Sequence, residues 1–118
     1  MPSPVRYFIG DELEPLTMWW FANDQLVDFS QSHTYVVKVA TASAPLTAVF
    51  TKTEGVTGDT GSGTARDGDP NLTVFWSSTG ELNDLTSPGL YLCEIVATRA
   101  DGKERTSVVQ LQMSSRMA

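Results

Sequence analysis

The sequence has one histidine and one cysteine, and the surroundings of both argue against a catalytic role. His33 is the one histidine, and it follows Gln31 and Ser32 in a polar run with no nucleophile-elbow motif elsewhere in the chain. Cys93 is the one cysteine and lies among apolar residues, where a thiol usually packs as a small, unreactive hydrophobic group. We therefore predict a loop histidine without a chemical role, a core cysteine and no catalytic residue.

The segment 54–70 is rich in glycine and aspartate and invites a phosphate or metal interpretation. It lacks the Lys-Ser or Lys-Thr pair that follows a phosphate-binding loop. At its end, 67–71 places oxygen ligands at alternate positions, as a calcium loop does. However, Leu72 stands where that loop needs glycine, and no glutamate follows at its twelfth position. We predict no metal, no cofactor and a long surface loop over 54–70, either flexible or ordered by a neighbouring subunit.

Two further motifs have a simpler interpretation than a functional one. The acidic segment 10–15 lacks an opposing acid or base, so we predict a solvated turn, with a salt bridge to a basic partner as the alternative. Asn71-Leu72-Thr73 matches an N-glycosylation sequon, but residues 1–7 lack the basic region and apolar stretch of a secretory signal. We attribute the sequon to chance.

Length and composition restrict the class of protein. A chain of 118 residues suits one domain, and its single cysteine excludes an intrachain disulfide. Fourteen acidic and eight basic residues give a net charge of −6, which argues against nucleic acids and anionic membranes as partners. The longest apolar run, Met18 to Ala22, is far shorter than a membrane span. We expect a soluble protein made in a cytoplasm, with neither a nucleic-acid nor a membrane partner.

Short segments of alternating or β-branched residues, separated by turn residues, recur along the whole chain and predict an all-β fold. The expected strands are Val5–Ile9, Leu16–Phe21, Leu26–Phe29, Thr34–Ala40, Leu46–Lys52, Asn71–Ser77, Leu90–Thr98 and Glu104–Met113. Asn23-Asp24 suits a turn because both residues tolerate positive φ. Asp101-Gly102 predicts a type I′ hairpin between the last two strands.

Alternation along the strands selects the candidate core. Val37 lies on the apolar face of its strand, as Trp76 does on another. In the strand Leu90–Thr98, Tyr91, Cys93 and Ile95 share one face. Because both faces of this strand are apolar near its start, we expect it to be central and covered on both sides.

Part of this region resembles an immunoglobulin-type domain. Tyr91-Leu92-Cys93, preceded by Asp84 and Pro88-Gly89, is similar to the approach to strand F, where a tyrosine two residues before a cysteine closes the corner into the strand. The resemblance implies a single immunoglobulin-like antiparallel β-sandwich of about 7–8 strands over residues 1–118, without a disulfide. Trp76 would then be the core tryptophan.

A second resemblance spans most of the chain. It consists of Val5-Arg6-Tyr7-Phe8-Ile9-Gly10-Asp11, Val27-Asp28-Phe29-Ser30, Asn71-Leu72-Thr73-Val74-Phe75-Trp76, Pro88-Gly89-Leu90-Tyr91 and Gly102-Lys103-Glu104-Arg105. This pattern is similar to small immunoglobulin-like domains of tailed bacteriophages, including the N-terminal domain of upper baseplate proteins and stand-alone virion proteins.

That resemblance implies a non-enzymatic structural protein of the virion, made in the cytoplasm of the bacterial host. As an accessory or decoration protein of the capsid or tail, it would bind other virion proteins, as an oligomer on the particle. The alternative is a baseplate or tail-tip adsorption module that recognises a host surface glycan or protein.

The candidate interface is Met18-Trp19-Trp20-Phe21. In a strand, Met18 and Trp20 would face one side and Trp19 and Phe21 the other, so large side chains would occupy both faces. Either the N-terminal arm or the long loop covers the second face, or that face contacts another virion protein, since tryptophan is enriched at interface hot spots.

Overall fold

The computed structural model describes residues 5–62, 68–77, 80–85 and 87–115, which form β-strands of very different lengths. The strands and one 3-10 helix follow these described parts of the chain in the order β1 (Val5–Phe8), β2 (Leu16–Met18), β3 (Phe21–Ala22), β4 (Gln25–Leu26), β5 (His33–Thr41), β6 (Ala48–Lys52), β7 (Val56–Gly58), β8 (Leu72–Val74), η1 (Glu81–Asp84), β9 (Gly89–Arg99) and β10 (Glu104–Ser114). The predicted all-β fold is confirmed, and Cys93 is free and buried. No helix in the described ranges is long and apolar enough to cross a membrane.

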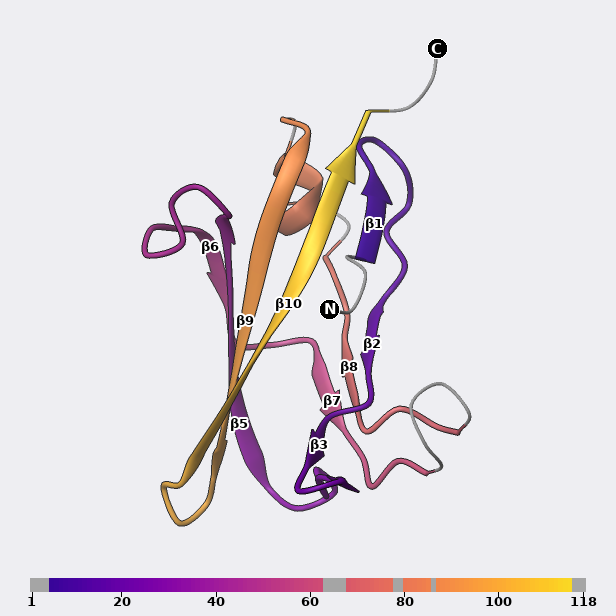
Figure 1. The fold of residues 1–118 in the computed structure, drawn as a ribbon, viewed down its shortest axis with the longest axis vertical. Coiled ribbons are helices and arrows are strands. Elements are labelled where there is room, and N and C mark those ends of the chain that lie inside the picture. The colour runs from indigo at the N-terminus through magenta and orange to yellow at the C-terminus, as the bar shows by residue number, and fades with distance from the viewer. Residues whose placement is uncertain (1–4, 63–67, 78–79, 86, 116–118) are drawn as a thin grey trace.

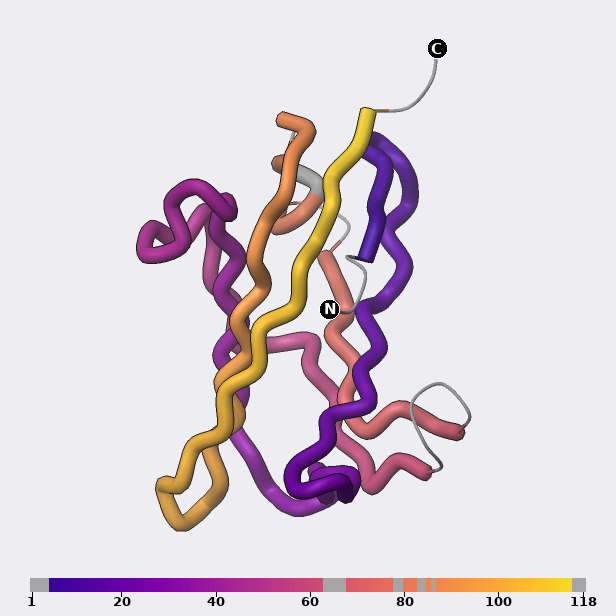
Figure 2. Tube along the Cα trace, viewed as in Figure 1, coloured from indigo at the N-terminus to yellow at the C-terminus, as the bar shows by residue number. Residues whose placement is uncertain are grey.

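The strands form two main sheets that lie side by side as layers (Figure 1). The five-stranded sheet has the order β1-β10-β9-β5-β6, the three-stranded sheet has the order β2-β8-β7, and β3 and β4 form a separate hairpin. Figure 2 shows β9 and β10 running side by side along the molecule. The expected antiparallel pattern is wrong for β1, which pairs parallel to β10 with Val5 opposite Leu111. β1 therefore lies at the edge of the five-stranded sheet beside the last strand, whereas its sequence neighbour β2 belongs to the other sheet.

The core lies between the two sheets and draws alternate residues from both. Its buried members are Tyr7, Leu16, Trp20, Val27, Phe29, Val37, Val39, Leu72, Val74, Leu82, Leu85, Tyr91, Cys93, Ile95, Ala97, Leu111 and Met113. Among the candidate core residues, Val37, Cys93 and Ile95 are completely buried and Tyr91 is 5% exposed. Trp76 is half-buried and packs against this cluster.

The turn between β9 and β10 is not the predicted type I′ turn. The Gly102 N–H donates to the Arg99 carbonyl (2.9 Å), and the Arg99 N–H donates to the Lys103 carbonyl (2.9 Å). Gly102 has a φ of 89°, whereas Asp101 does not adopt positive φ. This is a three-residue loop in which a type I turn precedes a left-handed glycine. The Asp101 carboxylate accepts the Lys103 N–H (3.1 Å) and so holds the aspartate in this position.

The type I′ geometry occurs instead in the hairpin of β3 and β4. Asn23 and Asp24 have φ values of 53° and 63°, and Ala22 lies opposite Gln25. Two successive residues at positive φ define this turn type. The prediction of a turn at Asn23-Asp24 that uses positive φ is therefore confirmed.

The predicted strand Leu46–Lys52 starts later than expected. It begins at Ala48, because the Ala44 N–H donates to the Thr41 carbonyl and the Thr47 N–H donates to the Ala44 carbonyl. These two successive turns carry Leu46 away from the sheet, where it is 99% exposed.

The prediction of a loop over all of 54–70 is wrong at Val56–Gly58, which forms β7 and pairs with β8. A Cβ atom on Gly58 would lie 2.5 Å from the Phe29 carbonyl oxygen, so the chain approaches closely here and only glycine fits. The glycine that suggested a loop therefore permits a packed strand. Residues 63–67 of the predicted loop lie outside the described residues.

Candidate interaction surfaces

The candidate interface Met18–Phe21 is not the continuous two-faced strand that we predicted. β2 ends at Met18 and β3 begins at Phe21, so the two tryptophans lie between strands. Trp20 is 8% exposed, and its ring centroid lies 5.1 Å from that of Phe29 in the core. The half-buried Trp19 donates its indole N–H to the Gly68 carbonyl (3.2 Å). Met18 is half-buried and Phe21 is 37% exposed, so this segment is mainly internal, with part of 54–70 against Trp19.

Asn71 explains why the strand breaks at this point. Its side chain is fully buried, accepts the Trp20 N–H (2.8 Å) and donates to the carbonyls of Trp20 and Val27 (2.9 Å each). The side chain thus replaces the strand pairing that β2 loses after Met18. The sequon asparagine therefore joins the backbone at Trp20 to the backbone at Val27, and its amide is not accessible in the folded chain. Sequence reasoning missed this role, and the only local signal was an asparagine between Pro70 and a strand.

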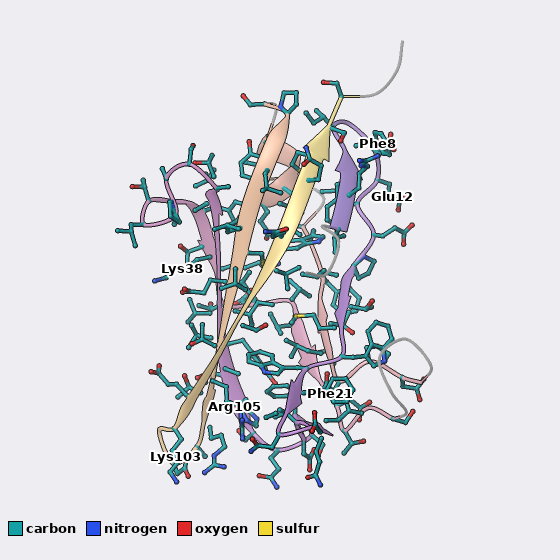
Figure 3. All side chains as sticks on the ribbon, viewed as in Figure 1. Phe8, Glu12, Phe21, Lys38, Lys103 and Arg105 are labelled. Atoms are coloured by element: carbon teal, nitrogen blue, oxygen red, sulfur yellow. The ribbon has the colours of Figure 1, made fainter. Side chains whose placement is uncertain are left out.

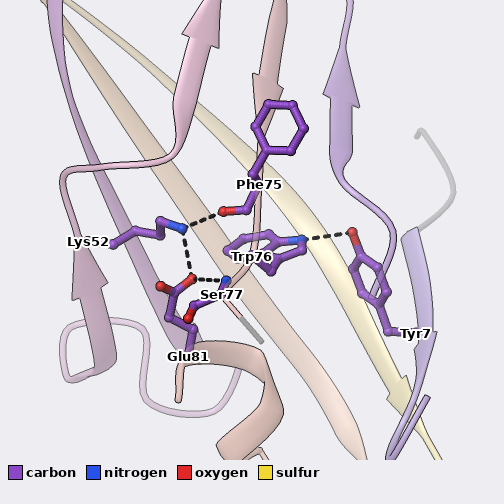
Figure 4. Close-up of polar contacts among 6 residues, drawn as sticks. All are labelled: Tyr7, Lys52, Phe75, Trp76, Ser77 and Glu81. Carbon is purple, nitrogen blue, oxygen red and sulfur yellow. Dashed lines mark hydrogen bonds and ion pairs between the residues drawn. The ribbon is translucent and has the colours of Figure 1, made fainter. Parts of the chain in front are cut away.

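A polar cluster joins the end of β6 to the segment after β8 (Figure 4). The Lys52 Nζ atom lies 2.7 Å from Glu81 Oε1, and their side chains are 9% and 23% exposed. Lys52 also donates to the Phe75 carbonyl, and its Nζ lies 5.3 Å from the centroid of the Trp76 ring. Glu81 accepts the Ser77 N–H (3.0 Å). We call Lys52, Glu81 and Trp76 the lysine cluster.

The lysine cluster extends to the first strand through Trp76. The Trp76 indole donates to Tyr7 Oη (3.0 Å), and Tyr7 donates to the Glu14 carbonyl (3.0 Å). Burial raises the pKa of Tyr7, so the hydroxyl stays neutral and keeps both bonds. The tryptophan predicted as a core residue therefore connects the edge of one sheet to the other through its polar end.

The contacts of the lysine cluster hold the end of β6 against the segment after β8. An open pocket of about 560 Å³ lies beside it, lined by Thr51, Lys52, Thr53, Glu54, Gly55, Phe75, Trp76, Ser77 and Glu81. The Phe75 carbonyl and the Glu81 carboxylate both accept from Lys52 Nζ, so contacts within the chain fix the position of this side chain. The prediction of a loop histidine is wrong, because His33 begins β5. Its Nδ1 atom is 2.8 Å from the Gln31 carbonyl oxygen. Within the described ranges, no three His, Cys, Asp or Glu side chains are placed to bind a metal.

Cys93 gives a measurable pH dependence of stability. Burial raises the pKa of its thiol from 9.0 to about 12. Below pH 9 the folded and unfolded states both hold the proton, and the stabilisation is fully present. As the pH rises toward 12, the unfolded thiol ionises first, so the free energy of unfolding falls by about 1.4 kcal/mol per pH unit. We predict that Cys93→Ala lacks this decline.

The measurement is urea denaturation of both proteins between about pH 8 and pH 11, a range that spans the ordinary thiol pKa. The wild-type advantage over Cys93→Ala should shrink with rising pH, because all other titrating groups are shared. Parallel curves for the two proteins would contradict the prediction.

The outer face of the five-stranded sheet, turned away from the core, carries three rows of residues that are opposite one another in the pairing register. The rows are Val36, Val96 and Thr106; then Thr51, Lys38, Glu94 and Val108; then Ala48, Ala40, Leu92 and Gln110. Lys38 and Glu94 are the charged members, and the others are apolar or uncharged. Val108 is 54% exposed, and a groove of about 340 Å³ runs past it to Pro45 and Leu46. A weakly charged face of this kind is typical of an interaction site.

Tyr91 forms a tertiary bond where β9 begins. Its hydroxyl donates to the Ser87 carbonyl (2.9 Å), four residues earlier in the chain, while its ring is buried. The bond fixes the path by which the chain enters β9 from η1.

Comparisons with protein-family models, with curated proteins and with solved structures found no match to this chain.

Proposed function

We propose that this chain is an immunoglobulin-like structural protein of a tailed bacteriophage particle, which binds other virion proteins and has no catalytic activity. The order β10-β9-β5-β6 matches strands G, F, C and C′ of a variable-type immunoglobulin sheet, and β2-β8-β7 matches B, E and D. The bond from Tyr91 to Ser87 is the type found in the tyrosine corner of such domains. The assignment to phage particles rests on the sequence resemblance.

The outer face of the five-stranded sheet is the observation that carries the binding role. Apolar residues of β5, β6, β9 and β10 flank the Lys38 and Glu94 pair on this face, and Val108 is 54% exposed there. Interface cores are depleted in charge in the same way. In the lysine cluster, by contrast, Lys52 contacts Phe75, Glu81 and Trp76 of its own chain.

The test is Val108→Glu, which places a carboxylate on this face at an already exposed position. We expect the variant to fold and to lose about tenfold or more of its occupancy on particles assembled without the wild-type protein, because a desolvated charge opposes burial. Thr17→Glu is the matched control, since Thr17 is exposed on β2 of the other sheet. Occupancy is measured by mass spectrometry of purified particles, and cryo-EM gives the position and copy number. Equal occupancy of the Val108→Glu and Thr17→Glu proteins would refute the proposed surface.

A further inference from the structure

The outer face of the five-stranded sheet has a pairing pattern that is complementary to itself. Across β5 and β9, Val36 lies opposite Val96, Lys38 opposite Glu94 and Ala40 opposite Leu92. Val36 and Val96 are both apolar, Lys38 and Glu94 carry opposite charges, and the small Ala40 lies beside the larger Leu92. Figure 3 shows Lys38 pointing away from the three-stranded sheet, so this pattern is presented outward.

Consider a two-fold axis that runs parallel to the strands, between β5 and β9. Rotation about this axis places β5 of a second copy over β9 of the first, at the same level along the strands. Lys38 of each copy then faces Glu94 of the other, and Val36 of each copy faces Val96 of the other. Sheets packed about 10 Å apart with aligned strands allow these contacts.

The next strands outward fit the same operation. β10 of one copy comes over β6 of the other, so Val108 faces Thr51, because both belong to the Lys38 row. Val108 is 54% exposed in the single chain and would bury its side chain against a threonine methyl group. No like charges meet within these rows. The three rows are therefore complementary to themselves, as an isologous interface requires.

We propose that the partner of this face is a second copy of the chain, and that two sheets form a symmetric dimer around Lys38 and Glu94. The proposal rests on the proposed function, because it uses the same binding surface and names a second copy of the chain as the virion protein that this surface binds. Two salt bridges at the centre fix the register, and the apolar pairs around them supply the buried area. A strongly charged partner would fit this face poorly, because Lys38 and Glu94 are the charged residues in the three rows.

The experiment measures the mass of the purified chain by sedimentation velocity from about 1 µM to about 1 mM, a range that covers weak and moderate association. The wild-type protein is expected to approach twice 12.8 kDa as concentration rises. Lys38→Glu and Glu94→Lys each place like charges across the axis and should weaken dimerisation about tenfold or more. An equimolar mixture of the two variants should form a heterodimer. In it, the introduced carboxylate of one variant faces the introduced ammonium of the other, and the remaining Lys38 faces the remaining Glu94.

Controls carry the same charge changes at exposed positions away from the face. Lys103→Glu lies in the turn before β10, and Glu12→Lys lies beyond β1, at the other end of the molecule in Figure 3. Both should dimerise like the wild type. Circular dichroism checks that every variant is folded.

A wild-type chain that stays monomeric over the whole range would overturn the proposal, as would a mixture that fails to restore the dimer. If a monomeric wild type still loses particle occupancy in Val108→Glu, the face binds a different virion protein, and only the dimer fails. If the dimer forms but Val108→Glu leaves particle occupancy unchanged, this face is not what attaches the chain to the particle, and the dimer stands.

Discussion

Replacing Asn71 with alanine is expected to lower the free energy of unfolding by about 4 kcal/mol, since the variant orphans buried backbone groups at about 1–3 kcal/mol each. The amide accepts from the Trp20 N–H and donates to the carbonyls of Trp20 and Val27. The Trp20 carbonyl keeps a second donor, the Val27 N–H. The Trp20 N–H and the Val27 carbonyl lose their partner in a fully buried site. Urea denaturation at neutral pH measures the difference.

A second substitution separates hydrogen bonding from packing. Asn71→Asp keeps the side-chain shape and an acceptor for the Trp20 N–H, but it turns an oxygen toward two carbonyls. Its cost relative to the wild type should fall as the pH drops through the range in which the carboxyl takes up a proton, because the protonated acid can donate again. Gln31→Ala, at an exposed polar residue, should change stability by about 0.5 kcal/mol or less. A cost below about 1 kcal/mol for Asn71→Ala would show that water replaces the amide.

The sequence was most informative where local chemistry and burial agree. In β9, alternate apolar residues predicted the buried face of Tyr91, Cys93 and Ile95, because a side-chain period of two is a local property of a strand. Asn23-Asp24 predicted its turn for the same reason, since few residue types tolerate positive φ.

The sequence was least informative where a distant segment decides the conformation. Gly58 suggested a loop, but it lies in β7. A glycine is needed in this strand because Phe29 and Tyr35 leave no room for a side chain. The run Met18–Phe21 suggested a strand, but Asn71, 51 residues from Trp20 along the chain, takes over the pairing. Composition and periodicity report each residue's own preference and not the contact that overrides it.

The candidate site shows the same division. The sequence left open whether the second face of Met18–Phe21 is covered by the N-terminal arm or the long loop or contacts another protein. The structure places Trp20 in the core and Gly68 of the segment 54–70 against Trp19. The sequence predicts that both faces of Leu90–Thr98 are covered near its start, so it does not identify the outer face of the five-stranded sheet as an interaction surface. The complementarity of Lys38 and Glu94 emerges only from the register that places them opposite each other.

Breaking the lysine cluster is expected to have the second large effect on stability. Lys52→Met should lower the free energy of unfolding by about 2–3 kcal/mol, less than for a fully buried pair, because the Glu81 side chain is 23% exposed. The variant loses the ion pair, the bond to the Phe75 carbonyl and the contact with the Trp76 ring. Glu81→Gln should cost about 1–2 kcal/mol, since the amide oxygen can still accept the Ser77 N–H.

A double-mutant cycle with Lys52→Met and Glu81→Gln isolates the coupling between the two side chains, expected at about 1–2 kcal/mol. The chain supplies a matched control in Arg99 and Asp101, whose paired side chains are 39% and 49% exposed. Water and salt screen that pair, so the cycle of Arg99→Met and Asp101→Asn should give a clearly smaller coupling than the cycle at Lys52 and Glu81. Added salt should reduce the Arg99–Asp101 coupling more than the Lys52–Glu81 coupling, because Lys52 is largely shielded from solvent. Equal couplings with equal salt dependence would mean that the lysine cluster acts as a surface ion pair and does not hold β6 to the segment after β8.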